Sequence, residues 1–278
     1  MESRSRSPGS PSFPLETPER MALRAGALSF SLAQNIDDLL QAYALVYRNY
    51  LRAEYIERHD SQLRYSVFNA LPETTTVVAR LDDRVVTTAS IIIDSPLGLP
   101  MDTIYQEEVD ALRAEGARVC EVTMLADRRR AGIRTIPSIL KMFKLILHYA
   151  HNKASISDIL ITINPSHEVF YTRYLPFEDF AGLRHYPAVK NAPALAKRQN
   201  LRTLFEEHKE HKLYDFFIDE AIPQEILEVK HSFSESELRD LFVIRRPIFQ
   251  KLPPFAIDHL KSCYPTHDFE RVMASVAK

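Results

Sequence analysis

Cysteine is scarce in this sequence, which contains only Cys120 and Cys263. Two cysteines so far apart are too few for a disulfide scaffold, and neither belongs to a pattern with the spacing of metal ligands. We therefore expect both to be free thiols in a reducing compartment. The histidines do not change this expectation, because their neighbours supply no ligand spacing either, and no metal site is predicted.

Long apolar runs and an excess of either charge are also missing. No apolar run approaches the roughly 20 residues that span a bilayer, and the first residues lack the apolar core of a secretory signal. We therefore expect a cytoplasmic protein without a transmembrane segment. The 35 basic and 37 acidic residues give a formal net charge of -2. This balance provides no overall field for a polyanion, so nucleic acid is not expected as a main partner.

Three regions differ in composition. Residues 1–25 are rich in Ser, Pro and Arg without periodicity, which predicts a disordered tail. Residues 26–204 contain the periodic apolar segments of one large domain. From the charged run FEEHKEHK onward, residues 205–278 are predicted to form a helical extension, in which Ser234 and Glu237 make a capping box.

The apolar periodicity of the large domain predicts alternating strands and helices. In order, it indicates a strand at 28–32, a helix in 35–60 broken near 50–55, hairpin strands at 74–81 and 84–94, a helix at 101–115, a strand at 118–127, a long amphipathic helix at 133–151, a strand at 158–164, a helix capped by Ser166, and a strand-like piece at 177–187. This order predicts an α+β protein with a mixed, mostly antiparallel sheet flanked by helices.

The strand at 118–127 holds the most informative residue, Glu121. Apart from this acid, nothing from Val119 to Ala126 is charged. A carboxylate inside an apolar strand needs a partner or has a chemical role. Its structural alternative is a buried ion pair with Arg48 or another helix cation.

Three segments occur in an order that resembles one enzyme family. They are SPLGLPMDTIYQEEVDALRAEGARVCEVTMLAD (95–127), ILITINPSHEVFYTRYLPFEDFAG (159–182) and RHYPAVKNAPALA (184–196). Together they resemble the N-acyl amino acid synthases, a branch of the GNAT acetyltransferase superfamily related to the acyl-homoserine-lactone autoinducer synthases. The resemblance covers about residues 28–204.

This resemblance implies a GNAT-like fold in which two central strands separate and a thioester donor enters between them. The donor would be a long-chain acyl group on the phosphopantetheine of acyl carrier protein, or acyl-CoA, and no tightly bound cofactor is implied. The acceptor would be the amine of an amino acid. The segment YRNYLRAEYI resembles the family's helix pair on the acceptor side, with Arg48 and Tyr50, and Asn164 falls in the part that faces the pantetheine arm.

Two departures accompany the resemblance. Autoinducer synthases carry an arginine three residues after the strand glutamate, whereas this chain has Met124, so Glu121 lacks that cation. The glycine-rich pyrophosphate loop of ordinary GNAT enzymes is also missing, and DRRRAGIR (127–134) replaces it.

Amide formation from a thioester requires a neutral amine, a site for the oxyanion and a proton for the departing sulfur. Glu121 is the candidate base, provided that burial raises its pKa. Thr123 shares its strand face and is a candidate for orienting water. Tyr171 stands where GNAT enzymes often keep a tyrosine near the sulfur, and is the candidate acid. Its alternative is core packing with neighbouring aromatics.

The oxyanion and the donor's phosphate require further groups. Backbone N–H groups where the strands part are the natural oxyanion donors, and they belong to Met124, Leu125 and Ala126. Arginines open the long helix, where a phosphate or an acidic carrier protein would bind, or where they would form a solvated loop. These arginines are Arg128, Arg129, Arg130 and Arg134.

The leading hypothesis is therefore an N-acyltransferase that moves a long acyl group from acyl carrier protein to an amino acid by direct attack. One alternative is a GNAT-like module that binds acyl thioester or acyl carrier protein without turnover. Another is an acyl-homoserine-lactone synthase, against which the missing arginine counts.

Overall fold

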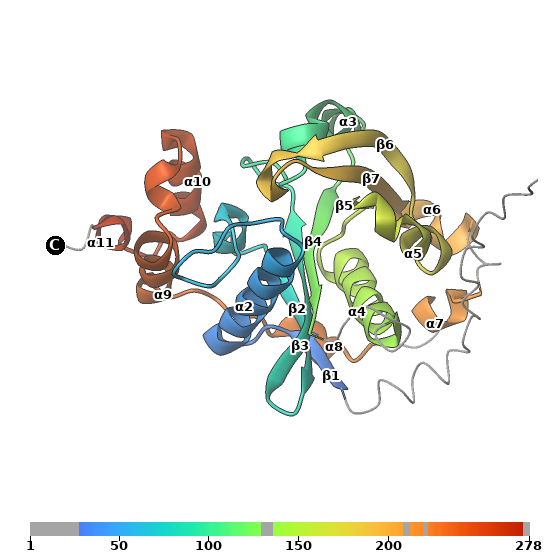
Figure 1. Ribbon diagram of the computed structural model, residues 1–278, viewed down its shortest axis with the longest axis horizontal. Helices are drawn as coiled ribbons and strands as arrows, with labels where there is room; N and C mark the ends of the chain where they lie inside the picture. Colours follow the sequence, from blue (N-terminus) through green and yellow to red (C-terminus); the bar gives the residue numbers. More distant parts are fainter. Residues whose placement is uncertain (1–27, 129–135, 208–211, 219–221, 275–278) are drawn as a thin grey trace, which may run out of the picture.

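A central seven-stranded sheet with helices on both faces organises the molecule (Figure 1). The computed structural model describes residues 28–128, 136–207, 212–218 and 222–274. The predicted tail, Arg129, Arg130 and Arg134 lie outside these residues. The strands are β1 (Leu28–Leu32), β2 (Thr75–Leu81), β3 (Arg84–Ile93), β4 (Val119–Asp127), β5 (Asp158–Ile163), β6 (Glu178–Tyr186) and β7 (Ala192–Asn200).

The described helices are α2 (Ile36–Arg52), α3 (Asp102–Ala114), α4 (Ile136–His148), α5 (Glu168–Arg173), α6 (Leu201–Glu207), α7 (Tyr214–Ile218), α8 (Gln224–Glu228), α9 (Glu235–Arg239), α10 (Pro254–Cys263) and α11 (Phe269–Met273). The longest of them, α2, α3 and α4, precede β7, and most of the helices that follow β7 are short. Short 3₁₀ turns occur at Val67–Ala70, Pro165–His167, Pro187–Val189 and Phe249–Lys251, and π turns at Tyr149–Lys153 and Asp240–Arg245. Among the described helices, none has the length and apolarity needed to cross a membrane.

The strand order is β1-β2-β3-β4-β5-β7-β6. All neighbouring strands are antiparallel except β4 and β5, which are parallel. The sheet is therefore mixed and mostly antiparallel, as the sequence predicts, and the hairpin of β2 and β3 is confirmed.

Helix α2 covers β3 and β4 on one face, and α4 lies on the other face against β1, β2 and β3 (Figure 1). The side chain of Asn35 starts α2 by accepting a 2.9 Å hydrogen bond from the Asp38 N–H. The helix ends at Arg52, and the chain continues as a loop to Ser66. The expected helix pair in YRNYLRAEYI is therefore wrong: a loop replaces its second helix.

Two other local predictions need correction. Ser166 does not cap the helix after β5, because its N–H and hydroxyl both donate to the Asn164 side chain, which caps the preceding 3₁₀ turn. The sequence pattern also missed β7, which lies between β5 and β6. Its run APALAKRQN contains no β-branched or aromatic residue, so strand propensity gives no signal there.

The chain after β7 passes across the sheet from the α4 side to the α2 side. Apolar residues near α6 and α7, including Leu204 and Phe216, join the core around α4. The His231 N–H then donates to the Ala33 carbonyl, and helices α9 to α11 lie beside α2 (Figure 1). Phe242 and Phe249 stack in the core that α2 shares with this segment. The extension therefore completes the hydrophobic core of the large domain.

Candidate functional site

The central strands β4 and β5 are paired for only part of their length. Their register covers three residue pairs and ends where Glu121 lies beside Leu160. Beyond this point β4 remains paired with β3, and β5 with β7. The predicted separation of two central strands is thus confirmed, and Glu121 stands at its apex.

A β-bulge follows Glu121 in the same strand. Thr123 pairs with Ser90 and Ala126 with Thr88, so Met124 and Leu125 together face the single residue between them on β3. Met124 has φ +58°, a left-handed backbone conformation that residues other than glycine rarely adopt. Bulges of this kind redirect the backbone groups of a strand. The bulge therefore falls within the three residues predicted to provide oxyanion donors.

Glu121 is almost completely buried, with 1% of its surface exposed. The Met101 N–H donates to its Oε2 at 2.7 Å, and Oε1 forms no hydrogen bond with any described residue. Burial raises the pKa of Glu121 to about 8, against the lowering effect of the Met101 N–H and with a smaller increase from Asp102. Glu121 makes no ion pair among the described residues, so the structural alternative, a buried ion pair with Arg48 or another helix cation, is wrong.

One peptide group connects Glu121 with a second strand. The N–H of the Pro100–Met101 peptide binds Glu121, and its carbonyl accepts a 2.9 Å hydrogen bond from the Tyr186 hydroxyl on β6. Hydrogen bonds that share one amide polarise one another. The turn before α3 thus holds the acid of β4 and the tyrosine of β6 in one network.

The shape of this turn depends on Gly98 and Asp102. Gly98 has φ +70°, and a Cβ atom there would lie 2.3 Å from the Asp102 Oδ2. The same oxygen accepts the Leu99 N–H at 2.9 Å and a guanidinium N–H of Arg113 at 2.7 Å. The turn therefore requires glycine at this position.

Tyr50 and Tyr186 lie within electrostatic reach of Glu121, and Tyr171 lies within reach of Tyr50. Burial raises the pKa of Tyr50, which lies at the end of α2, and the charge of Glu121 adds to the increase. Tyr186 has its pKa raised by burial and then by Glu121 and Tyr50. Burial also raises the pKa of Tyr171 on α5, with a further contribution from Tyr50. Helices from opposite faces of the sheet thus bring Tyr50 and Tyr171 within electrostatic reach of each other.

Tyr171 combines an aromatic ring that packs in the core with a hydroxyl that has no hydrogen-bond partner in the described chain. Its ring packs edge-to-face against Phe143 and Phe177, each 6.0 Å between centroids, as the core-packing alternative expects. The hydroxyl makes no hydrogen bond with any residue in the described part of the chain. Packing therefore fixes the ring and leaves a proton donor available.

Arg64 is the cation of this cluster, and the sequence analysis did not identify it. Its guanidinium lies 5.7 Å from the centroid of the Tyr50 ring and donates a long 3.4 Å hydrogen bond to the Ala188 carbonyl. Its charge lowers the pKa values of Tyr50 and Tyr186. Arg64 lies in a loop without periodic pattern, so only the fold could reveal its proximity to the site.

The remaining strand residues line both sides of the separation. Thr123 is half-buried and its hydroxyl has no partner among the described residues. Leu125 packs toward the α4 core, while Ala126 is buried toward α2. On β5, Thr162 follows Leu160 by two residues, and its buried hydroxyl oxygen also lacks a partner there. Thr162 was not predicted, because threonine is a common strand residue.

Arg48 lies elsewhere, on the exposed side of α2. Partial burial lowers its pKa, and the neighbouring cations Arg128 and Arg52 lower it further. Arg128 is exposed at the end of β4, where its N–H donates to the Val86 carbonyl. Arg48 and Arg128, two residues predicted for different roles, therefore contribute to one cationic surface.

Asn164 follows the end of β5 and is half-buried. Its side-chain oxygen is engaged by Ser166, so its role toward a donor arm stays a prediction. Within the described ranges, no three His, Cys, Asp or Glu residues are grouped as they would be around a metal ion.

The raised pKa of Glu121 predicts a pH-dependent stability. Between pH 4.5 and about 8 the folded protein holds a proton on Glu121 that the unfolded chain has lost. The contribution of this residue is therefore complete below pH 4.5 and is lost as the pH rises through 8. We expect the stability of wild type relative to Glu121→Gln to fall by up to roughly 1 kcal/mol per pH unit in this window, measured by urea unfolding.

Glu107→Gln provides the control, since Glu107 is exposed on α3. The difference between wild type and this variant should not change with pH in the same way. A flat difference for Glu121→Gln would mean that Glu121 is ionised throughout, contrary to its environment.

Comparison with known proteins agrees with this geometry. A family model described as N-acyl amino acid synthase FeeM matches residues 41–200. The structure of FeeM, an N-acyl amino acid synthase from uncultured soil microbes, is 28% identical to this chain with a TM-score of 0.58. The alignment covers 69% of this chain and 97% of FeeM. Nearly all of FeeM is therefore matched, whereas part of this chain lies outside the alignment.

Two other solved structures are more distant. The AHL synthase LasI is 13% identical with a TM-score of 0.49, covering 63% of this chain and 89% of LasI. An N-acetyltransferase described as putative, from Lactobacillus plantarum, is 13% identical with a TM-score of 0.44, covering 63% of this chain and 99% of that one. No curated protein matches the sequence. Because the family model matches more than half of the chain, the protein belongs to the FeeM family of N-acyl amino acid synthases and is a GNAT-type N-acyltransferase.

Proposed function

We propose that this enzyme transfers a long-chain acyl group from acyl carrier protein to the amine of an amino acid. The observation that carries the proposal is Glu121, a buried carboxyl group with a pKa of about 8 where β4 and β5 part. FeeM, to which the chain is similar, is described as an N-acyl amino acid synthase. The family relationship supports the reaction class, and the site supports its chemistry.

The pKa of Glu121 suits proton removal from an α-amine. With a pKa of about 8, Glu121 is ionised in part of the molecules near neutral pH, and the ionised carboxylate can accept the proton that a neutral amine loses as it attacks. The unbonded Oε1 is the atom that accepts this proton, because Oε2 is held by the Met101 N–H. The acid is therefore both oriented and available.

The acyl transfer proceeds by direct attack. The amine nitrogen forms a bond to the thioester carbonyl carbon and gives a proton to Glu121. Backbone N–H groups at the bulge of Met124 and Leu125 stabilise the oxyanion. The carbon–sulfur bond then breaks, and the Tyr171 hydroxyl supplies the proton to the departing sulfur. Thr123, on the face of Glu121, orients a water between amine and acid when the two do not touch.

The acceptor's carboxylate is assigned to Arg64. Its guanidinium stands over Tyr50, and no carboxylate of the described chain pairs with it. Arginine binds a carboxylate through paired N–H donors. In this proposal Arg64 takes the place that the sequence analysis gave to Arg48, and Tyr50 remains beside the acceptor.

The donor's carrier protein is assigned to the cationic surface around Arg48, Arg52 and Arg128. The pKa of Arg48 is lowered first by partial burial and then by Arg128 and Arg52, and an acidic partner would offset the repulsion among these three cations. The surface lies at the end of β4, so a phosphopantetheine arm arriving there would follow the separation toward Glu121. Asn164, at the end of β5, borders the other side of that path.

Glu121→Gln tests the reaction. Incubation of the enzyme with acyl carrier protein carrying C12 to C16 chains and pooled amino acids should give N-acyl amino acids by mass spectrometry. The variant should lose at least about 100-fold in kcat, since it cannot accept the amine's proton. Wild-type kcat should rise with pH and level off above about 8.

Glu107→Gln, an exposed glutamate on α3, should retain full activity. Tight binding of acyl carrier protein without any product would instead indicate the non-catalytic binding module. An unchanged rate in Glu121→Gln would remove Glu121 from the mechanism.

Arg64→Gln tests the acceptor assignment. We expect the KM for phenylalanine to rise about tenfold, because a charge-assisted pair to its carboxylate is lost. The KM for phenethylamine, which has no carboxylate, should be high in wild type and change little. Arg84→Gln, on the exposed end of β3, should affect neither. Equal use of both acceptors by wild type would contradict recognition of an amino acid.

Arg128→Glu tests the donor assignment. Reversal of this charge should raise the KM for acyl carrier protein by about tenfold or more, and the effect should shrink at high salt. The KM for an acyl thioester of pantetheine, which lacks the carrier protein, should stay within about twofold. Equal effects on both donors would place Arg128 at the acyl site rather than at a carrier surface.

A further inference from the structure

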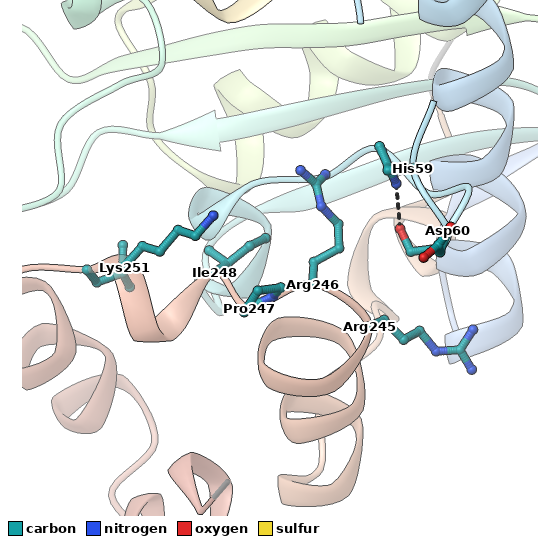
Figure 2. Close-up of a pocket in the computed structure, with 9 residues that line it drawn as sticks. His59, Asp60, Arg245, Arg246, Pro247, Ile248 and Lys251 are labelled. Atoms are coloured by element: carbon teal, nitrogen blue, oxygen red, sulfur yellow. Dashed lines mark hydrogen bonds between the residues drawn. The ribbon is translucent and has the colours of Figure 1, made fainter. Parts of the chain in front are cut away.

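A cavity lies away from Glu121, between the loop after α2 and the segment that joins α9 to α10. Its volume is about 480 Å³. One wall belongs to residues 59–61, and the other to residues 245–252 (Figure 2). It shares no lining residue with the candidate acyl-transfer site. The second wall also lies beyond residues 41–200, which the family model matches.

Arg246 is the central cation of this cavity. One guanidinium nitrogen donates to the carbonyls of Leu63 and Tyr65, at 3.4 and 3.0 Å, and the group lies 5.4 Å from the centroid of the Tyr65 ring. No carboxylate among the described residues pairs with it. The half-buried Arg246 guanidinium thus contacts carbonyl groups and an aromatic ring but no anion. Its positive charge is therefore not neutralised by an ion pair.

The other charged residues of the lining leave this excess in place. Lys251 is exposed and makes no ion pair in the described chain, and Figure 2 shows that it and Arg246 extend toward the same side. Arg245 extends away from them and is paired with Asp240 at 2.7 Å. Asp60 is the one carboxylate that lines the cavity. Arg246 and Lys251 together exceed this one carboxylate, so the cavity carries a net positive charge.

The rest of the lining includes a polar imidazole and apolar side chains. The Nδ1 of His59 is 2.9 Å from the Ser61 hydroxyl, which leaves Nε2 without a partner in the described chain. Pro247, Ile248 and Leu252 contribute apolar surface. A ligand that fits such walls combines an anionic end with an organic body.

We propose that this cavity binds a small organic phosphate monoester. A phosphate monoester carries nearly two negative charges at neutral pH, and Arg246 and Lys251 give the cavity the net positive charge that attracts such an anion. Its oxygens accept the guanidinium N–H groups that the two carbonyls leave free. Its organic part packs on Ile248 and Leu252. The cavity shares no lining residue with the candidate acyl-transfer site, and the proposal would remain if the proposed acceptor or donor were wrong.

Calorimetric titration of the full chain with phenyl phosphate tests the site at constant ionic strength, with inorganic phosphate and benzoate as comparisons. Phenyl phosphate should bind saturably and at least about fivefold more tightly than either comparison. Lys251→Gln and Arg246→Gln should each weaken its binding about tenfold. Lys261→Gln, an exposed lysine on α10, is the matched control and should leave binding unchanged.

The two pocket variants keep the test decisive. Arg246→Gln also removes bonds to the loop carbonyls and can disturb folding, whereas Lys251 has no contact whose loss would do so. Absence of saturable binding to wild type, or equal binding by Lys251→Gln, would overturn the proposal. If inorganic phosphate bound as tightly as phenyl phosphate, the claim that the cavity recognises the organic group of the ligand would be wrong. If benzoate bound more tightly than phenyl phosphate, the claim that the anionic group is a phosphate would be wrong.

Discussion

The Glu121 carboxyl group is buried in a sheet that gives it one amide and no cation. Burial of an ionised carboxylate without a cation costs free energy, and this cost raises the pKa of Glu121. The carboxyl group lies where β4 and β5 separate, so the pairing of these two strands does not continue past it. If the two strands stayed paired, the same acid would be an isolated polar defect in the core.

The surrounding residues come from elements that are remote in the sequence. Tyr50 ends α2, Tyr171 lies on α5 across the sheet, and Tyr186 is on β6. The chain after β7 contributes indirectly, because Arg246 holds the carbonyls of Leu63 and Tyr65 on either side of Arg64. The extension thus supports the loop that carries the cation of the site, besides filling the core beside α2.

The sequence predicted those parts of the fold that depend on local pattern. The hairpin, the capped start of α2 and the position of Glu121 all follow from periodicity, and the resemblance to a family supplied the separation of the strands. The missed parts depend on tertiary contacts. The strand β7 has no β-branched residue, Arg64 lies in an irregular loop, and Arg48 is on the outer side of its helix. The partner of Glu121 is a backbone amide, which no residue type can signal.

That amide belongs to a turn whose shape depends on a glycine. Gly98 touches no reacting group, yet a methyl group there would collide with the Asp102 oxygen that fixes the next residue of the turn. The displacement would pass along the backbone to the Pro100–Met101 amide and so to the acid. Alanine at 98 would therefore disturb the hydrogen bond to Glu121 from a distance, although residue 98 does not contact Glu121 itself.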